Sequence, residues 1–355
     1  MVKIPKIHRT IELFCGPGGL GYGAILAKAG QFKCKHVYAI DIDESSCETY
    51  AKNICNGNRQ TVQRADLNKY YPYKKLPDCE GLLFGFPCND FSLVGEKKGL
   101  SGKYGGLYKA GVKCLKAKRP LWFLAENVSG ISNKKDDFVF RKILKELKNC
   151  DYVLNVHKYK FEQYGVPQKR HRYIIVGIRS DVNKVFKPPI EKITDPKSYI
   201  TAAETFETIK PYHPNQELPK HSNAVIKRLE NTLPGDNAWS NRLPDKYRLK
   251  GVKGAKLSQI YKKLKPNEPS YTVTGSGGGG THMYHWSENR ALTNRERASL
   301  QTFPNNYEFY GSKEQIRKQI GMAVPVKMAK IIITSILKTF ANKAYKSINK
   351  SNYII

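Results

Sequence analysis

Short apolar runs recur through residues 10–180, and most of them end at a glycine or a carboxylate. A short continuous apolar run bounded by turn residues is typical of a strand that is buried on both faces of a sheet. The pattern predicts strands at 10–14, 36–40, 62–66, 81–84, 121–126 and 173–177.

Segments with helical periodicity lie between these runs. The predicted helices are 22–29, 45–54 and the strongly amphipathic segment 137–148. Strands that alternate with helices predict an α/β fold, in which a mostly parallel sheet carries helices on both faces.

The composition and periodicity of the sequence change near residue 185. Beyond Pro188-Pro189 the chain is rich in Pro, Asn, Lys and Tyr without a clear period, and 240–265 holds nine Lys or Arg with one acid, Asp245. Helical periodicity returns at 328–341. We therefore expect a second, smaller and irregular domain at 185–314, and a C-terminal helix that packs on the first domain.

The charge is strongly positive, because 61 Lys and Arg oppose 30 Asp and Glu and leave a net charge of +31. A field of this sign favours a long polyanion such as nucleic acid as the partner. A general abundance of lysine in the source proteome would give the same excess.

None of the eight cysteines forms a CxxC pair, and none lies beyond residue 150. This pattern indicates reduced thiols inside a cell and argues against a disulfide framework or a zinc ribbon. We expect no metal, no membrane-spanning segment and a cytoplasmic location.

A glycine-rich turn, Phe14-Cys15-Gly16-Pro17-Gly18-Gly19-Leu20-Gly21, follows the first strand and opens a helix. Glycines in this place let a ligand approach backbone N–H groups at a helix N-terminus. Asp41 ends the second strand, where a carboxylate accepts hydrogen bonds from a ribose diol. A nucleoside cofactor site is predicted, and an ordinary tight turn between strand and helix is the alternative.

Two further strand ends carry reactive groups. Gly85-Phe86-Pro87-Cys88 places a thiol on a turn after one strand, and Glu126 ends another strand 38 residues later. A thiol and an acid at two ends of one sheet predict nucleophilic attack by sulfur with proton donation to the substrate. The alternatives are an inert core cysteine and a structural or helix-capping acid.

The segment Gln168-Lys169-Arg170-His171-Arg172 precedes the last predicted strand. Arg170 and Arg172 share a face if that strand extends back to them, and could then hold a phosphate or the rim of a polar base. The alternative is that both arginines are ordinary exposed residues of the surface. His282 and His285 have an HxxH spacing, but the neighbouring run of glycines argues against the helix that a metal site of this kind needs.

These motifs, in this order, resemble those of the DNA (cytosine-C5) methyltransferase family over about residues 10–330. The turn at Cys88, the Glu126-Asn127-Val128 segment and the arginine segment resemble its nucleophile, acid and arginine motifs. The glycine-rich turn resembles its S-adenosylmethionine loop. Two later segments resemble the motif that buttresses the recognition region and the last motif: 290–304 and 319–325.

The resemblance implies a Rossmann-like S-adenosylmethionine-dependent sheet with helices on both faces, formed by 1–184 and 315–355. A smaller irregular target-recognition domain with a hinge is expected at 185–314. The implied catalytic residues are Cys88, Glu126, Arg172 and Arg170. The implied cofactor-binding residues are Phe14, Gly16, Gly18, Gly19, Leu20, Asp41, Ile42, Asp66, Leu67, Pro87, Ala323 and Val324.

The implied reaction is methylation of C5 of a cytosine that is flipped out of double-stranded DNA. Cys88 would attack C6, Glu126 would hydrogen-bond or protonate N3, and Arg172 would offset charge on O2. Three positions depart from the family pattern: Asn89 replaces the usual Gln, Met322 the usual Asn and Asp41 the commoner Glu. None of these removes a reacting group.

The resemblance also implies the methyltransferase of a restriction–modification system. Such an enzyme is expected to act as a monomer, and its cognate endonuclease would cut the same site without necessarily binding it. A tRNA cytosine-C5 methyltransferase of the same fold is an alternative, disfavoured by the long segment between the arginine motif and the last motif. A silent DNA-binding relative is disfavoured by the joint presence of Cys88, Glu126 and Arg172.

Overall fold

The computed structural model describes residues 2–69, 71–86, 106–128, 137–249, 258–278, 280–348 and 353–354. The chain forms two compact units. The first unit comprises Met1–Lys160, His171–Glu191 and Val324–Ile355, and the second comprises Phe161–Arg170 and Lys192–Ala323. The second unit therefore includes Phe161–Arg170, which the sequence analysis assigned to the first domain.

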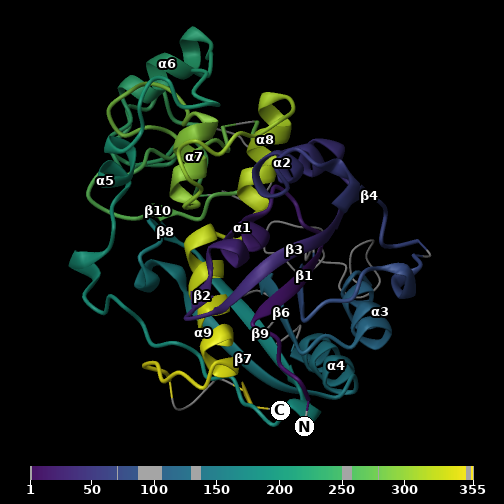
Figure 1. Cartoon of the computed structure of the whole chain (residues 1–355). Helices are drawn as coiled ribbons and strands as arrows, with labels where there is room; N and C mark the ends of the chain where they lie inside the picture. The colour runs from purple at the N-terminus through teal and green to yellow at the C-terminus, as the bar shows by residue number, and fades with distance from the viewer. Residues whose placement is uncertain are drawn as a thin grey trace. The chain divides into compact units, whose positions relative to one another are not determined.

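A sheet of nine strands, among the described residues, forms the centre of the first unit (Figure 1). Its order is β11-β7-β9-β6-β5-β1-β3-β2, and β4 also pairs with β3. The strands are β1 (Ile7–Leu13), β2 (Lys28–Ala29), β3 (Phe32–Asp41), β4 (Val62–Arg64), β5 (Gly81–Gly85), β6 (Trp122–Val128), β7 (Tyr152–Lys160), β9 (His171–Arg179) and β11 (Tyr353–Ile354).

The sheet is mixed, which corrects the expectation of a mostly parallel one. β1, β3, β4, β5 and β6 pair in parallel, whereas β9 is antiparallel to both β6 and β7. The sequence did not predict β7, whose side chains alternate between buried and exposed over part of its length. Only residues 161–170 separate β7 from β9, too few for the helical crossover that a parallel pair needs.

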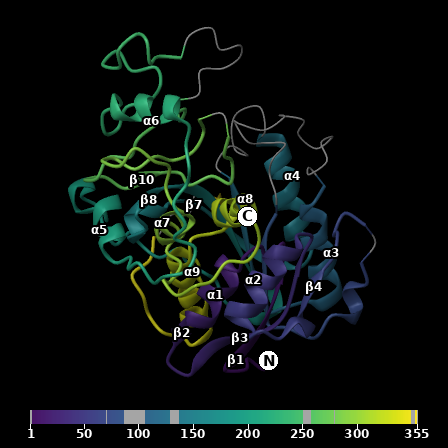
Figure 2. The same cartoon turned by 90° about the horizontal axis from the view of Figure 1, so that it is seen from above.

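Helices cover both faces of this sheet, as predicted (Figures 1 and 2). On one face, buried side chains of α3 and α4 pack with those of β1, including Ile11 and Leu13. On the other face lie α1, α2 and α9, and α1 approaches α9 so closely that a Cβ built on Gly23 would stand 2.5 Å from that of Ala329. The helices are α1 (Gly19–Leu26), α2 (Glu44–Ile54), α3 (Tyr108–Lys118), α4 (Asp137–Lys148) and α9 (Val326–Phe340).

The second unit has little regular structure, as expected for the irregular region. Two short strands occur among the described residues of this unit, β8 (Gln168–Lys169) and β10 (Ser270–Tyr271), and they pair with each other. Its helices are α5 (Ala202–Glu207), α6 (Asn223–Glu230), α7 (Asn294–Leu300) and α8 (Lys313–Met322). Reciprocal side-chain and backbone hydrogen bonds cap α5, α7 and α8 at their N-termini, which stabilises the short helices.

A buried arginine holds the loops of the second unit together. Arg295 of α7 is 0% exposed and donates to the carbonyl oxygens of Pro214, Pro304 and Tyr307. One fixed guanidinium thus binds three carbonyl groups from two separate loops, in place of a strand ladder. Glycine allows a second close approach here, since a Cβ built on Gly321 would stand 2.0 Å from the backbone nitrogen of Gly275.

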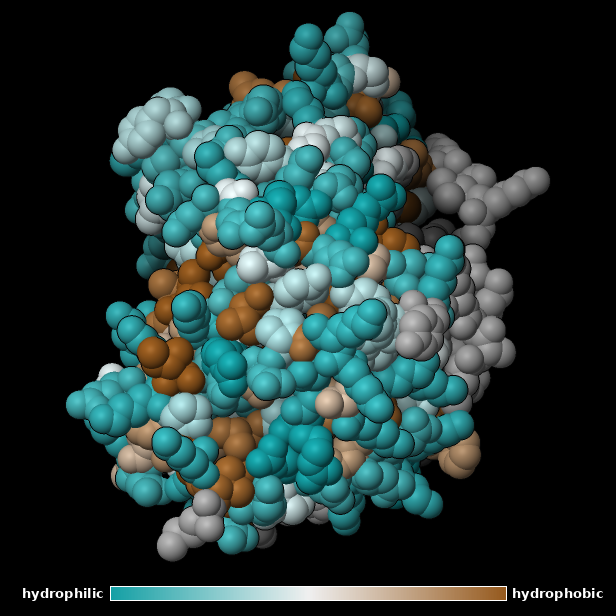
Figure 3. All heavy atoms as spheres, turned by 45° about the vertical axis from the view of Figure 1, so that its right-hand side comes forward, coloured by the Kyte–Doolittle hydropathy of each residue, from teal (hydrophilic) through white to brown (hydrophobic). Residues whose placement is uncertain are grey.

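The stretch Lys313–Phe340 is long and apolar enough, by length and composition alone, to cross a membrane. In the structure this stretch is divided between α8 and α9, and 72% of its most apolar window is buried. Its apolar side chains are therefore used for packing within the fold. On the face of the molecule drawn in Figure 3, hydrophilic residues predominate and apolar residues form scattered groups.

Candidate active site

The carboxyl ends of four parallel strands meet at one edge of the sheet in the first unit. Leu13 of β1 lies opposite both Ile40 of β3 and Phe84 of β5, and Gly85 lies opposite Glu126 of β6. The strand order reverses here, because β3 and β5 flank β1 on opposite sides. Open α/β sheets bind their ligands at such a point, beyond the carboxyl ends of the strands.

The cysteine predicted as the nucleophile follows β5. Pro87 and Cys88 lie outside the described residues, as do 89–92. The strand that leads to them is placed, since a Cβ built on Gly85 would stand 3.7 Å from Oε2 of Glu126. The chain therefore departs toward Cys88 from a point beside the predicted acid.

Glu126 and Arg172 form a buried ion pair at the same edge. Nε of Arg172 lies 3.0 Å from Oε1 of Glu126, and the two side chains are 13% and 11% exposed. The antiparallel pairing of β6 with β9 brings them together, because Val128 lies opposite Arg172 and residues two apart on a strand share a face. Oε1 of Glu126 faces the Arg172 guanidinium but makes no hydrogen bond to the part of the chain that is described, so this carboxyl group can still hydrogen-bond to a ligand.

The contacts of Arg170 differ from those of Arg172. β9 begins at His171, so the strand does not extend back to Arg170. The guanidinium of Arg170 is buried in the second unit, where Nη1 lies 3.1 Å and 3.3 Å from the carbonyl oxygens of Val273 and Gly321. Arg170 and Arg172 therefore do not share a strand face, and these contacts favour a structural role for Arg170.

The glycine-rich turn is open at Gly16 as far as the described residues show. Phe14, Gly16 and Gly18 have φ values of 55°, 51° and 93°, in the left-handed region where glycine is unstrained. A Cβ built on Gly16 would meet no described residue within 4 Å, whereas one built on Gly19 would stand 2.1 Å from the carbonyl oxygen of Val324. Glycine at position 19 thus lets the start of α1 touch the segment that leads into α9.

Asp41 ties the end of β3 to this turn. Its Oδ2 accepts the N–H of Gly16 at 2.8 Å, and its Oδ1 accepts that of Asp43 at 2.9 Å. Burial raises the pKa of Asp41 above its ordinary value, against the backbone donors that lower it. Ile42, the next residue, is 58% exposed. An open cradle, an anchored carboxylate and an exposed apolar side chain together fit the sugar and base of a nucleoside.

The structure also describes four other residues that were predicted to bind the cofactor. Leu20 and Leu67 are buried, at 3% and 7% exposure. Asp66 accepts the backbone N–H of Asn68 at 3.0 Å. Ala323 ends α8 in the second unit. Leu20 and Leu67 thus contribute packing and Asp66 shapes the turn after β4, and contact of these residues with the cofactor stays a prediction.

Sequence reasoning missed a chain of buried polar groups beneath the glycine-rich turn. Tyr50 Oη donates to Oε2 of Glu12 at 2.9 Å and lies 3.2 Å from Nδ1 of His36. Burial raises the pKa of Glu12 to about 8 and lowers that of His36 to about 4. A Cβ built on Gly21 would stand 2.4 Å from Oε2 of Glu12. The available signal was an acid inside the apolar run Thr10-Ile11-Glu12-Leu13.

The HxxH pair has local partners. Nδ1 of His285 accepts the backbone N–H groups of Ser287 and Glu288, at 3.3 Å and 3.2 Å. His282 lies beside Tyr284 and His221. No group of three or more His, Cys, Asp or Glu that could hold a metal occurs among the described residues.

The fold is that of a methyltransferase. A DNA modification methyltransferase of an Escherichia coli prophage has a similar structure, with a TM-score of 0.71 and 21% identity over 94% of this chain and 99% of that one. The Dnmt2 methyltransferase of S. pombe has a TM-score of 0.61 and 19% identity over the same shares.

The sequence identifies the family. A sequence model of the family described as C-5 cytosine-specific DNA methylase matches residues 8–338. The type II methyltransferase M.BbvI of Brevibacillus brevis is 50% identical over 96% of this chain and 94% of its own length. M.NgoFVII of Neisseria gonorrhoeae is 38% identical over 96% and 89%. The chain belongs to this family and is a DNA cytosine-5 methyltransferase, an enzyme that needs a methyl donor.

Proposed function

We propose that this chain methylates C5 of a flipped-out cytosine within a specific sequence of double-stranded DNA, through a covalent bond between Cys88 and C6. The observation that carries the proposal is the buried Glu126–Arg172 pair beside Gly85, three residues before Cys88. The acid, the arginine and the strand leading to the thiol converge on one point, as addition to an activated ring requires.

Cytosine C5 is a weak nucleophile until the ring is made electron-rich. The Cys88 thiolate adds its electron pair to C6, and electrons of the C5–C6 bond become available at C5. Glu126 holds or donates the proton at N3, and Arg172 offsets the charge that develops at O2. After C5 takes the methyl group, loss of the C5 proton returns its electron pair to the ring and expels Cys88 as thiolate.

The proposed methyl donor is S-adenosylmethionine, which supplies an electrophilic methyl group when bound. Asp41 would accept hydrogen bonds from the ribose hydroxyls through lone pairs that its two backbone donors leave free. Ile42 would pack against the adenine, and Gly16 would let the cofactor approach the backbone. Phe14, Gly18 and Gly19 would shape the turn, and Pro87 and Val324 are proposed to border the same site.

Target recognition is proposed to reside in the second unit, within the predicted domain 185–314. Its irregular loops suit contacts in the major groove, where each base pair presents a distinct pattern of donors and acceptors. The net charge of +31 favours the phosphate contacts that would hold a distorted duplex. The enzyme is proposed to be monomeric and to protect sites that a cognate endonuclease cuts without needing to bind this chain.

Bisulfite sequencing of DNA treated with the purified protein and S-adenosylmethionine tests this proposal. We expect methylated cytosines at one recurring sequence of a few base pairs. Absence of methylation, or methylation without sequence context, would contradict it. Omission of the methyl donor provides the control.

A further inference from the structure

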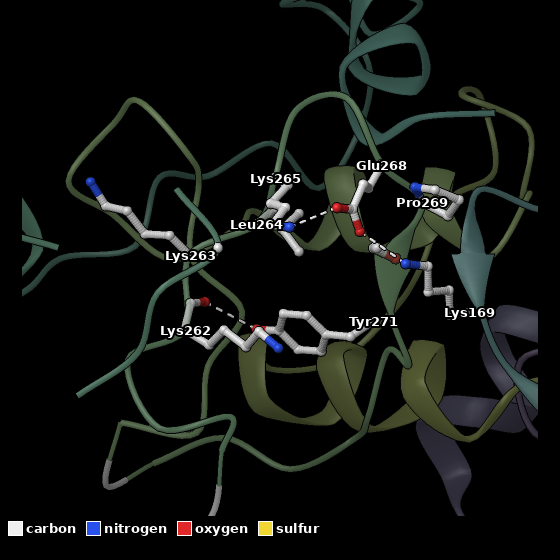
Figure 4. A pocket seen from close by; sticks show the side chains of 10 residues that line it. Lys169, Lys262, Lys263, Leu264, Lys265, Glu268, Pro269 and Tyr271 are labelled. Atoms are coloured by element: carbon white, nitrogen blue, oxygen red, sulfur yellow. Dashed lines mark hydrogen bonds and ion pairs between the residues drawn. The ribbon is translucent and has the colours of Figure 1, made fainter. Parts of the chain in front are cut away.

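A cavity in the second unit is lined by lysines and includes neither Glu126 nor Arg172. It has a volume of about 250 Å³ and includes Lys169 of β8, Tyr271 of β10 and the segment Lys262-Lys263-Leu264-Lys265. Figure 4 shows these side chains around the cavity, with the Lys263 ammonium directed away from the others. Nζ of Lys263 instead contacts Oδ1 of Asn289, at 3.2 Å.

The wall of this cavity is fixed by hydrogen bonds. The backbone N–H of Lys263 donates to the carbonyl of Asp236 and that of Leu264 to the carbonyl of Tyr284, at 3.0 Å and 2.9 Å. Tyr271 Oη donates to the carbonyl of Lys262 at 3.1 Å. The lysine side chains therefore extend from a backbone that is already ordered, which lowers the entropy cost of binding a ligand.

One acid lies among the lysines. Glu268 contacts Nζ of Lys169 at 2.9 Å and Nζ of Lys265 at 2.7 Å. The ammonium of Lys262 instead lies 5.2 Å from the centre of the Tyr271 ring. Three lysine charges against one carboxylate leave the cavity with an excess of two positive charges.

A buried arginine adds to this excess. Arg297 is 1% exposed, and its two terminal nitrogens make no hydrogen bond to the described part of the chain. Its charge lies close enough to Tyr271 to lower the pKa of that phenol, against the larger opposite effect of burial. A buried, poorly compensated cation behind the cavity wall strengthens its attraction for an anion.

We propose that this cavity binds a backbone phosphate of the DNA, through Lys262, Lys265 and Lys169. The inference rests on the proposed function for its ligand. A phosphodiester carries one negative charge and accepts several hydrogen bonds, which suits ammonium groups on long stems. Glu268 pairs with the half-exposed side chains of Lys169 and Lys265 and weakens the site, because a phosphate must compete with its carboxylate.

Two opposite charge changes test the proposal. K262Q/K265Q should weaken binding of a cognate and an unrelated duplex by the same factor, about tenfold at low salt, and should reduce the slope of log K against log salt by roughly 0.9 per lost contact. E268Q should tighten binding to both duplexes. Fluorescence anisotropy across a salt series measures these effects without methyl transfer.

The matched control is K220Q/K227Q, which removes two exposed lysines outside the cavity. Binding by K262Q/K265Q that equals binding by K220Q/K227Q, or weaker binding by E268Q, would overturn the proposal. A loss confined to the cognate duplex would assign the lysines to base recognition and also overturn it. Failure of the proposed function has a different signature, since the wild-type protein would then leave no methylated cytosine in the sequencing assay.

Discussion

In the first unit the residues assigned to chemistry stand at strand ends, whereas in the second unit the arginines of the sequence motifs hold loops together. Gly85 and Glu126 are adjacent because β5 and β6 pair in register. Arg170 and Arg295 donate instead to backbone carbonyls of their own unit. Sheet register turns sequence spacing into spatial adjacency, while an irregular region must order each loop with separate side-chain contacts.

The largest expected effect comes from the thiol. C88A should lower the rate of methyl transfer by about 10⁴-fold or more, because no other group of the site forms the bond to C6. DNA binding should persist. Single-turnover methylation measures the loss, and C55A, the same change at a half-exposed cysteine after α2, should retain activity.

A smaller loss is expected at the ion pair. E126Q should lower the rate about 10²- to 10³-fold, because the amide cannot supply the proton at N3 and no longer balances Arg172. The same assay at saturating methyl donor measures it. A rate within twofold of wild type would remove Glu126 from the mechanism.

In the second unit the expected effect is on stability. R295M should lower the free energy of unfolding of this unit by about 3 kcal/mol, since three buried or partly buried carbonyl groups lose a charged donor. Denaturant unfolding measures this, and R242M, which alters an arginine with a 63% exposed side chain, is the control. Equal stability of the two variants would show that Arg295 does not order these loops.

The smallest effect is a pH dependence of stability that Glu12 gives to the first unit. Glu12 has a pKa of about 8 in the folded chain against an ordinary 4.5, so the folded state binds its proton more tightly than the unfolded state. Its contribution to stability is therefore present below pH 4.5 and is lost as the pH rises toward 8. His36 has the opposite effect, because its pKa falls from 6.5 to about 4 on folding, so its contribution to stability grows as the pH rises from 4 to 6.5.

E12Q should flatten this part of the stability profile between pH 5 and pH 9. Asp41 and Tyr50 are the other titratable groups that influence Glu12 most, and Y50F controls for loss of the hydrogen bond alone. Thermal unfolding across this range checks the expectation. An unchanged slope in E12Q would mean that another group governs the alkaline loss.

The sequence predicted most of the first unit, because buried strands leave continuous apolar runs and turn residues mark their ends. Helix α4 was predicted with the limits that the structure has. Strand β7 was missed, because its buried and exposed residues alternate over part of its length and do not form a continuous apolar run. The antiparallel pairing of β9 with β7 was therefore missed as well. The site residues were predicted from the resemblance to the family. The resemblance did not show that Arg172 pairs with Glu126 while Arg170 contacts carbonyl groups of the second unit, because this difference depends on where β9 begins.

The second unit was predicted only as irregular. Its loops depend on long-range contacts, such as that of Asn215 with the backbone of Phe309, which no local pattern reveals. The lysine-lined cavity joins residues from 169, 235 and 262–271. Such a site follows from tertiary contacts and not from spacing.

The most direct test of the central claim uses DNA with 5-fluorocytosine at the target position. With S-adenosylmethionine present, the fluorine at C5 cannot leave as a proton does, so the sulfur–C6 bond should persist and can be mapped by mass spectrometry of peptides. The account predicts an adduct on Cys88. An adduct on another cysteine, or methylation of normal DNA by the C88A variant, would contradict it.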